Sequence, residues 1–116
     1  MFLNDFLLHV QTGLTVEFQE TLSIIAEHYY YRPTEFTNGL IRPLINPAGC
    51  NEGSCKIFAF AKLHGLSQEQ TLALFGEYYR VDVLGNPDAG DHANIRTFMR
   101  DGWDGITFLG DTLIAK

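Results

Sequence analysis

The stretch that decides the fold is SCKIFAFAKLHGLSQEQTLALFGEYY, residues 54–79. Ser54 is a favourable N-cap, and the apolar residues after it recur at helical spacing, so they predict a helix over residues 54–64. The motif Ser67-x-x-Gln70 is a capping box, which predicts a second helix over residues 68–79. Two strongly apolar helices in the middle of the chain indicate a mainly helical domain.

Toward the N-terminus, helical spacing predicts two more helices. The first covers the opening ten residues or so and ends at Gly13. The second has Thr15 as its expected N-cap and ends at Arg32-Pro33, because the residue before a proline is pushed out of the α region. Its last turn would hold the tyrosines 29–31, which cannot all point inward, so at least one should be exposed.

The residue pattern is no longer helical over residues 34–53, which contain Pro43, Pro47 and the turn-forming dipeptides Asn38-Gly39 and Asn46-Pro47. This pattern predicts a long irregular excursion with one short strand around Phe36. Excursions of this length in compact domains are often functional, so the segment is the first place to look for a site.

Toward the C-terminus, Asp91 is the expected N-cap of a helix over residues 92–101, which Gly102 closes. The tail, ITFLGDTLIA, predicts a small terminal hairpin. The predicted fold is therefore α+β: a predominantly helical single domain over residues 1–116, with about five helices and a small antiparallel sheet.

Composition limits the possible functions. The 116 residues carry 14 acidic and 8 basic side chains, a net charge of −6 at pH 7, which argues against a nucleic-acid partner. The longest apolar run, residues 57–61, is far short of the roughly 20 residues that span a bilayer, so we expect no membrane segment. Two cysteines, Cys50 and Cys55, are typical of a protein kept in reduced cytosol, where we expect it to be made, without a disulfide between them.

The run Asn51-Glu52-Gly53-Ser54-Cys55-Lys56 enters the central helix and is a candidate binding site. Free N–H groups and the helix dipole at such a start favour anions, and they could lower the pKa of Cys55. The alternative is purely structural. Ser54 would then cap the helix, Gly53 would make the turn, and Cys55 would pack as a small apolar residue.

A cysteine-dependent hydrolase or transferase is the enzymatic alternative. Cys55, His92 and Asp104 could supply a nucleophile, a base and an orienting carboxylate. The spacing is unlike that of papain-like enzymes, which place their histidine much further downstream of the cysteine. The hypothesis therefore rests only on the general logic of a catalytic triad.

Two further polar groups lie after the central helices. Asp91, His92 and Arg96 form either a binding edge or a capped, solvated first turn. Trp103 either packs in the core or contributes to binding. We expect the 49–56 loop, the 88–92 loop and Trp103-Asp104 to converge on one face. Histidine and carboxylate spacings match no familiar zinc or calcium motif, so we expect neither a metal nor a cofactor.

Three stretches together resemble the HopJ type III effector family. They are EFTNG at 35–39, AGCNEGSCKIFAFAKLHGLSQEQTLALFGEYYR at 48–80 and DHANIRTFMRDGWDGI at 91–106. The resemblance implies a small bacterial protein of a family named for virulence effectors of plant-associated pathogens, which would be secreted into a host cell through a type III system. It carries over no catalytic residue, and the interpretation we favour is a non-enzymatic protein that acts through a protein-binding surface.

One feature departs from that pattern. Type III export signals are usually flexible and rich in serine, whereas the first serine here is Ser23 and the first ten residues predict an amphipathic helix.

Overall fold

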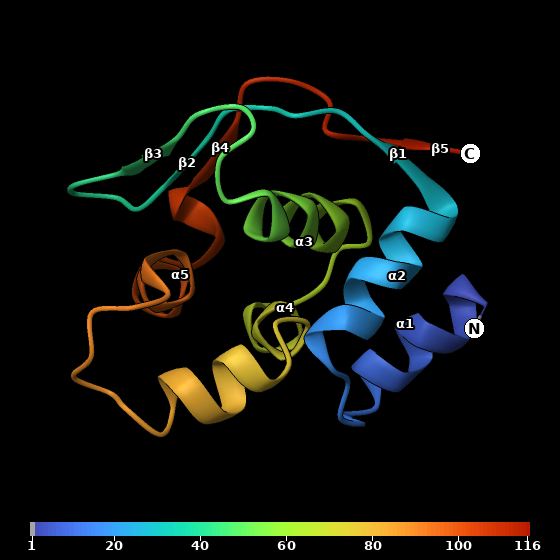
Figure 1. Ribbon diagram of the computed structural model, residues 1–116, viewed down its shortest axis with the longest axis horizontal. Helices are drawn as coiled ribbons and strands as arrows, with labels where there is room; N and C mark the ends of the chain where they lie inside the picture. The colour runs from blue at the N-terminus through green and yellow to red at the C-terminus, as the bar shows by residue number, and fades with distance from the viewer. Residues whose placement is uncertain (1) are drawn as a thin grey trace.

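A computed structural model describes residues 2–116 and shows a helix-rich α+β domain (Figure 1). Within these residues the elements follow in the order α1 (Leu3–Gln11), α2 (Phe18–His28), β1 (Tyr29–Tyr31), β2 (Phe36–Asn38), β3 (Leu44–Asn46), α3 (Glu52–Leu63), α4 (Gln68–Ala73), the π-helix η1 (Tyr78–Val83), α5 (Ala93–Asp101), the 3-10 helix η2 (Gly102–Gly105), β4 (Ile106–Phe108) and β5 (Leu113–Ala115).

Helix α3 is the centre of the domain, with the other helices and both sheets arranged around it (Figure 1). It is buried along most of its length, as expected of a helix that is apolar on nearly every side. Phe58 is fully buried, and its ring packs against four other aromatic rings, those of Phe36, Phe75, Phe98 and Trp103. The predicted α+β class is confirmed, and the stretch that predicts it forms the core.

The strands form two small antiparallel sheets. One has the order β3-β2-β4, and the other pairs β1 with β5. The predicted terminal hairpin is therefore wrong, because β4 pairs with β2 and β5 pairs with β1. The tail residues do form strands. A strand of three residues carries too little sequence pattern to specify its partner, so its pairing depends on where the helices place it. The excursion over residues 34–53 holds two strands, β2 and β3, where one was predicted.

The second helix differs from its prediction at both ends. Its N-cap is Glu17, which forms a capping box with Glu20, and Thr15 has no such role. The helix ends at His28, and the three tyrosines that follow form strand β1. Tyr29 is buried and Tyr30 exposed, as the alternation of a strand requires.

The predicted helix over residues 68–79 is interrupted. Ser67 and Gln70 form the predicted capping box, but α4 ends at Ala73. Gly76 then has a φ of +60°, and a side chain there would overlap the main-chain nitrogen of Phe18 and lie 2.8 Å from the carbonyl carbon of Glu17. This close approach of α2 breaks the helix, and the chain continues as a π-helix.

Within residues 2–116, no helix combines the length and the apolar character needed to cross a membrane.

Candidate functional site

A cleft of about 480 Å³ opens where the starts of α3 and α5 meet η1, strand β3 and the first residue of α2. Aromatic and amide side chains dominate its lining. The residues that line it are Phe18, Leu44, Ile45, Asn46, Asn51, Gly53, Ser54, Phe75, Tyr78, His92, Ala93, Asn94 and Ile95. It therefore unites the 34–53 excursion with two helix starts.

Both helices that open on the cleft begin at a residue in the left-handed region. Asn51 precedes α3 with φ 52° and ψ 48°, and His92 precedes α5 with φ 51° and ψ 49°. Neither side chain caps its helix. The predicted caps Ser54 and Asp91 are thus wrong: Ser54 lies inside the first turn of α3, and Asp91 precedes the cap of α5. Left-handed backbone is costly for residues other than glycine and is often found at functional sites.

Four asparagines form one hydrogen-bonded network, and three of them, Asn46, Asn51 and Asn94, line the cleft. The Oδ1 atom of Asn46 accepts from Nδ2 of Asn51 at 2.7 Å and from Nδ2 of Asn94 at 2.9 Å. Oδ1 of Asn94 accepts from Nδ2 of Asn38 at 3.1 Å and from Nδ2 of Asn46 at 3.2 Å. Each carboxamide fixes the orientation of the next, so β2, β3, the start of α3 and α5 are held in one geometry.

His92 joins the cleft to the π-helix. Its ring stacks on Tyr78 with a centroid distance of 5.2 Å, and its Nε2 lies 3.0 Å from Oδ2 of Asp82. Tyr78 in turn packs against Phe18 with a centroid distance of 4.6 Å. Phe18, Tyr78 and His92 thus form one continuous aromatic wall. π-helical segments often occur at functional sites, and this one supplies two of the contacts of His92.

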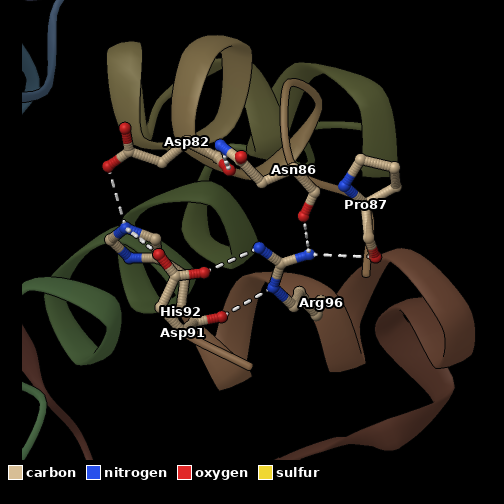
Figure 2. Close-up of polar contacts among 6 residues, drawn as sticks. All are labelled: Asp82, Asn86, Pro87, Asp91, His92 and Arg96. Carbon is tan, nitrogen blue, oxygen red and sulfur yellow. Dashed lines mark hydrogen bonds and ion pairs between the residues drawn. The ribbon is translucent and has the colours of Figure 1, made fainter. Parts of the chain in front are cut away.

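Arg96 holds the loop that leads to His92 (Figure 2). Its guanidinium donates to the carbonyl oxygens of Asn86 and Pro87 and to both the main chain and the carboxylate of Asp91. The hydrogen bond from Arg96 lowers the pKa of the Asp91 carboxyl. The donors of Arg96 are thus used inside the chain, which makes it a positioning residue for the loop.

Cys55 lies in the core and does not line the cleft. Its thiol donates to the carbonyl oxygen of Thr34, with a separation of 3.4 Å, and burial raises the pKa of the thiol. His92 contacts Asp82, and Asp104 is exposed on η2. The structure shows no contact that links Cys55, His92 and Asp104, so the geometry gives the nucleophile hypothesis no support. Cys50 is exposed, and both thiols are free.

The remaining predicted residues lie outside the cleft. Lys56 places its ammonium 4.7 Å from the centroid of the Tyr31 ring, and Glu52 is exposed in the first turn of α3. Trp103 packs edge-on against Phe58 and Phe98, and its Nε1 donates to the carbonyl oxygen of Leu66. This is the core role that was one of its two interpretations.

The predicted convergence is therefore met by the first two loops, because Asn51, Ser54 and His92 share the cleft. Trp103 and Asp104 do not line it. Sequence reasoning missed Phe18, which has the helical spacing of a core residue. Within residues 2–116, no group of three or more His, Cys, Asp or Glu residues is placed to hold a metal ion.

Comparison of the chain with known proteins identifies its family. The family model described as "HopJ type III effector protein" matches residues 3–113. The chain belongs to the HopJ family. A crystal structure of a protein of unknown function, VPA0580, superposes with a TM-score of 0.95 at 46% sequence identity, covering 100% of this chain and 95% of that one. No curated protein matches the chain.

Proposed function

We propose that this HopJ-family protein acts by binding a partner protein in the cleft between α3, α5 and η1. The observation that carries the proposal is the aromatic wall of Phe18, Tyr78 and His92, which lines the same cleft as the hydrogen-bonded amides of Asn46, Asn51 and Asn94. Aromatic side chains at the centre of a preorganised concave surface are typical of protein-binding hot spots. The starts of α3 and α5 leave first-turn N–H groups at the same cleft, without side-chain caps.

Export through a type III system is the second part of the proposal, and the description of the family supports it. An N-terminal reporter fusion tests it, with secretion compared between a strain that has a working type III system and a matched strain that lacks one. We expect secretion from the first strain alone. Equal release from both strains would contradict export by this route.

Photo-crosslinking tests the binding site directly. A benzoylphenylalanine placed at Tyr78 lies in the cleft, whereas the same group at Val81 lies on the same π-helix, exposed but outside the cleft lining. We expect a partner to crosslink from position 78 and not from position 81.

The partner protein that the crosslink identifies is then purified on its own. Its affinity is measured for the unmodified chain and for the variants Tyr78→Ala and His92→Ala. Each variant should weaken binding by about tenfold or more, as loss of a hot-spot aromatic does. Binding that neither variant changes would overturn the proposal.

A further inference from the structure

Strand β3 is an edge of the sheet β3-β2-β4, and Figure 1 shows it on the outer side of the hairpin. The hydrogen bonds of the central strand, β2, show which of its residues direct their main-chain groups toward β4 and which toward β3. The N–H of Gly39 donates to the carbonyl of Gly105, and the N–H of Leu109 donates to the carbonyl of Glu35. Main-chain groups alternate in direction along a strand, so the odd-numbered residues of β2 face β4.

The even-numbered residues of β2 consequently face β3. Phe36 is opposite Asn46 and Asn38 is opposite Leu44, so these pairs carry the β2–β3 hydrogen bonds. Ile45, between them, directs its N–H and C=O away from the sheet. The alternation leaves Ile45 without a bond to β2, and among residues 2–116 no main-chain hydrogen bond outside the helices and strands involves it. Ile45 is 67% exposed, and it lines the cleft.

Two prolines restrict this free edge. Pro43 and Pro47 lie two residues before and two residues after Ile45, so their nitrogens face outward as well. Proline has no N–H, and at outward-facing positions it leaves the β2–β3 ladder intact. The outer edge around Ile45 is thereby limited to a single N–H donor, which prevents the addition of a long strand.

We propose that the main chain of Ile45 docks an extended peptide segment of the partner, one residue of which exchanges two hydrogen bonds with Ile45. This inference rests on the proposed function, because it names how the partner enters the same cleft. The free donor and acceptor of Ile45 match the acceptor and donor of one extended residue.

The alternation of side chains gives this segment its orientation. The partner residues before and after the paired one point to the same face as the side chains of Leu44 and Asn46. Asn46 contacts Asn51 and Asn94 on that face, and all three line the cleft. A flanking side chain of the partner therefore enters the cleft, where the aromatic wall receives it.

A second copy of this chain is a poorer occupant of the edge. Antiparallel pairing of two β3 strands about Ile45 would place Pro43 of each copy opposite Pro47 of the other. Neither proline can donate, so no hydrogen bond would form beyond the central pair.

The test uses linear peptides selected on the purified full chain from a phage-displayed random library. Their affinities are measured for the unmodified chain and for Ile45→Pro, which removes the outward N–H but no ladder bond. Ile45→Ala is the matched control, because it removes the side chain and keeps the N–H. We expect Ile45→Pro to weaken the selected peptides by about tenfold or more, and Ile45→Ala to weaken them less. Circular dichroism confirms that both variants fold.

Hydrogen exchange on the unmodified chain provides a test that needs no variant. The amide of Ile45 should exchange rapidly in the free protein and slowly once a selected peptide is bound. Peptides that require Tyr78 but bind Ile45→Pro normally, with no slowing at Ile45, overturn this inference and leave the proposed function standing. Peptides that are insensitive to both Tyr78→Ala and His92→Ala, or a library that yields no binder, overturn the two together.

Discussion

The starts of α2 and α4 differ from the starts of α3 and α5. The first two carry complete capping boxes, Glu17 with Glu20 and Ser67 with Gln70. The other two begin at left-handed residues, Asn51 and His92, whose side chains cap nothing. Both of these starts line the cleft with their opening turns, whereas α2 contributes only its first residue, Phe18, and α4 contributes none. A missing side-chain cap alone does not mark the site, because α1 also begins without one. The left-handed backbone does: among residues 2–116, Asn51 and His92 are the two residues other than glycine with a positive φ, and both stand at helix starts that open on the cleft.

For the helices with capping boxes, we expect the largest loss of stability from Gly76→Ala, three residues after the end of α4. The new methyl group would overlap the main chain of Phe18, and the left-handed φ of +60° adds strain. We expect the free energy of unfolding to fall by about 3 kcal/mol or more. Urea denaturation measures it, with Gly13→Ala as the control. Gly13 also has a positive φ, but its new methyl group would meet no atom within 4 Å, so only the strain of about 1 kcal/mol applies. Equal losses for the two variants would contradict the steric argument.

The uncapped start of α5 depends on Arg96. Arg96→Ala leaves the carbonyl oxygens of Asn86 and Pro87 and the carboxylate of Asp91 without their donor. We expect a loss of about 2 kcal/mol in the free energy of unfolding, together with faster amide exchange over residues 86–92. Arg100→Ala is the matched control, since its side chain is 66% exposed and, among the residues that the structure describes, hydrogen-bonds only to its neighbour Asp101. It should cost no more than about 0.5 kcal/mol. An unchanged exchange rate in the loop would show that other contacts hold it.

Replacing Ser67 and Ser54 in turn by alanine compares a serine that caps a helix with a serine that lines the cleft. Ser67→Ala removes the side chain that accepts from the Gln70 N–H, and it should lower the free energy of unfolding by about 1 kcal/mol. Ser54→Ala, inside the first turn of α3, should change stability by less than about 0.5 kcal/mol but should weaken peptides that bind in the cleft. Thermal denaturation and peptide titration of both variants check this. The reverse pattern would mean that Ser54 is the structural residue.

The smallest expected effect is a dependence of the α2 start on pH. Oε1 of Glu77 accepts from the N–H of Phe18 at 2.9 Å, and this hydrogen bond lowers the pKa of the carboxyl below its ordinary value of 4.5. A carboxyl whose pKa is lower in the folded state stabilises fully above its unfolded pKa, and the stabilisation is lost as the pH falls through the folded pKa. Denaturation curves from neutral to acidic pH should therefore show a shallower loss for Glu77→Gln than for the unmodified chain. Parallel losses would assign the acid sensitivity to other carboxyl groups.

Much of the helical framework could be predicted from the sequence because its signals are local. Helices α3 and α5 lie within two residues of their predicted starts, and they end where Gly65 and Gly102 adopt positive φ. The end of α4 was not predictable in this way. Gly76 bends the chain because the backbone of α2 lies against it, and that contact joins residues far apart in the sequence.

The candidate site was predictable only in part. Asn51, Ser54 and His92 are polar residues at helix starts, which is a visible signal. Tyr78 and Phe18 have the spacing of core residues, and only the π-helix and the packing of α2 bring them to the cleft. Strand pairing was the other failure, since three-residue strands carry too little pattern to specify their partners.

The distribution of the strands along the chain has a consequence for biogenesis. Strand β1 has its partner in β5, and β4 completes the sheet of β2, so both sheets join residues 29–46 to residues 106–115. Ribosomal synthesis, or threading through a narrow channel with the N-terminus leading, delivers β1 and β2 long before β4 and β5. The sheet of β2 and β3 lacks its third strand until residue 108 has emerged, and β1 lacks its partner until residue 115 has emerged. Sheet closure is therefore the last step of folding on either route, and a truncation before residue 113 removes β5 and leaves β1 unpaired.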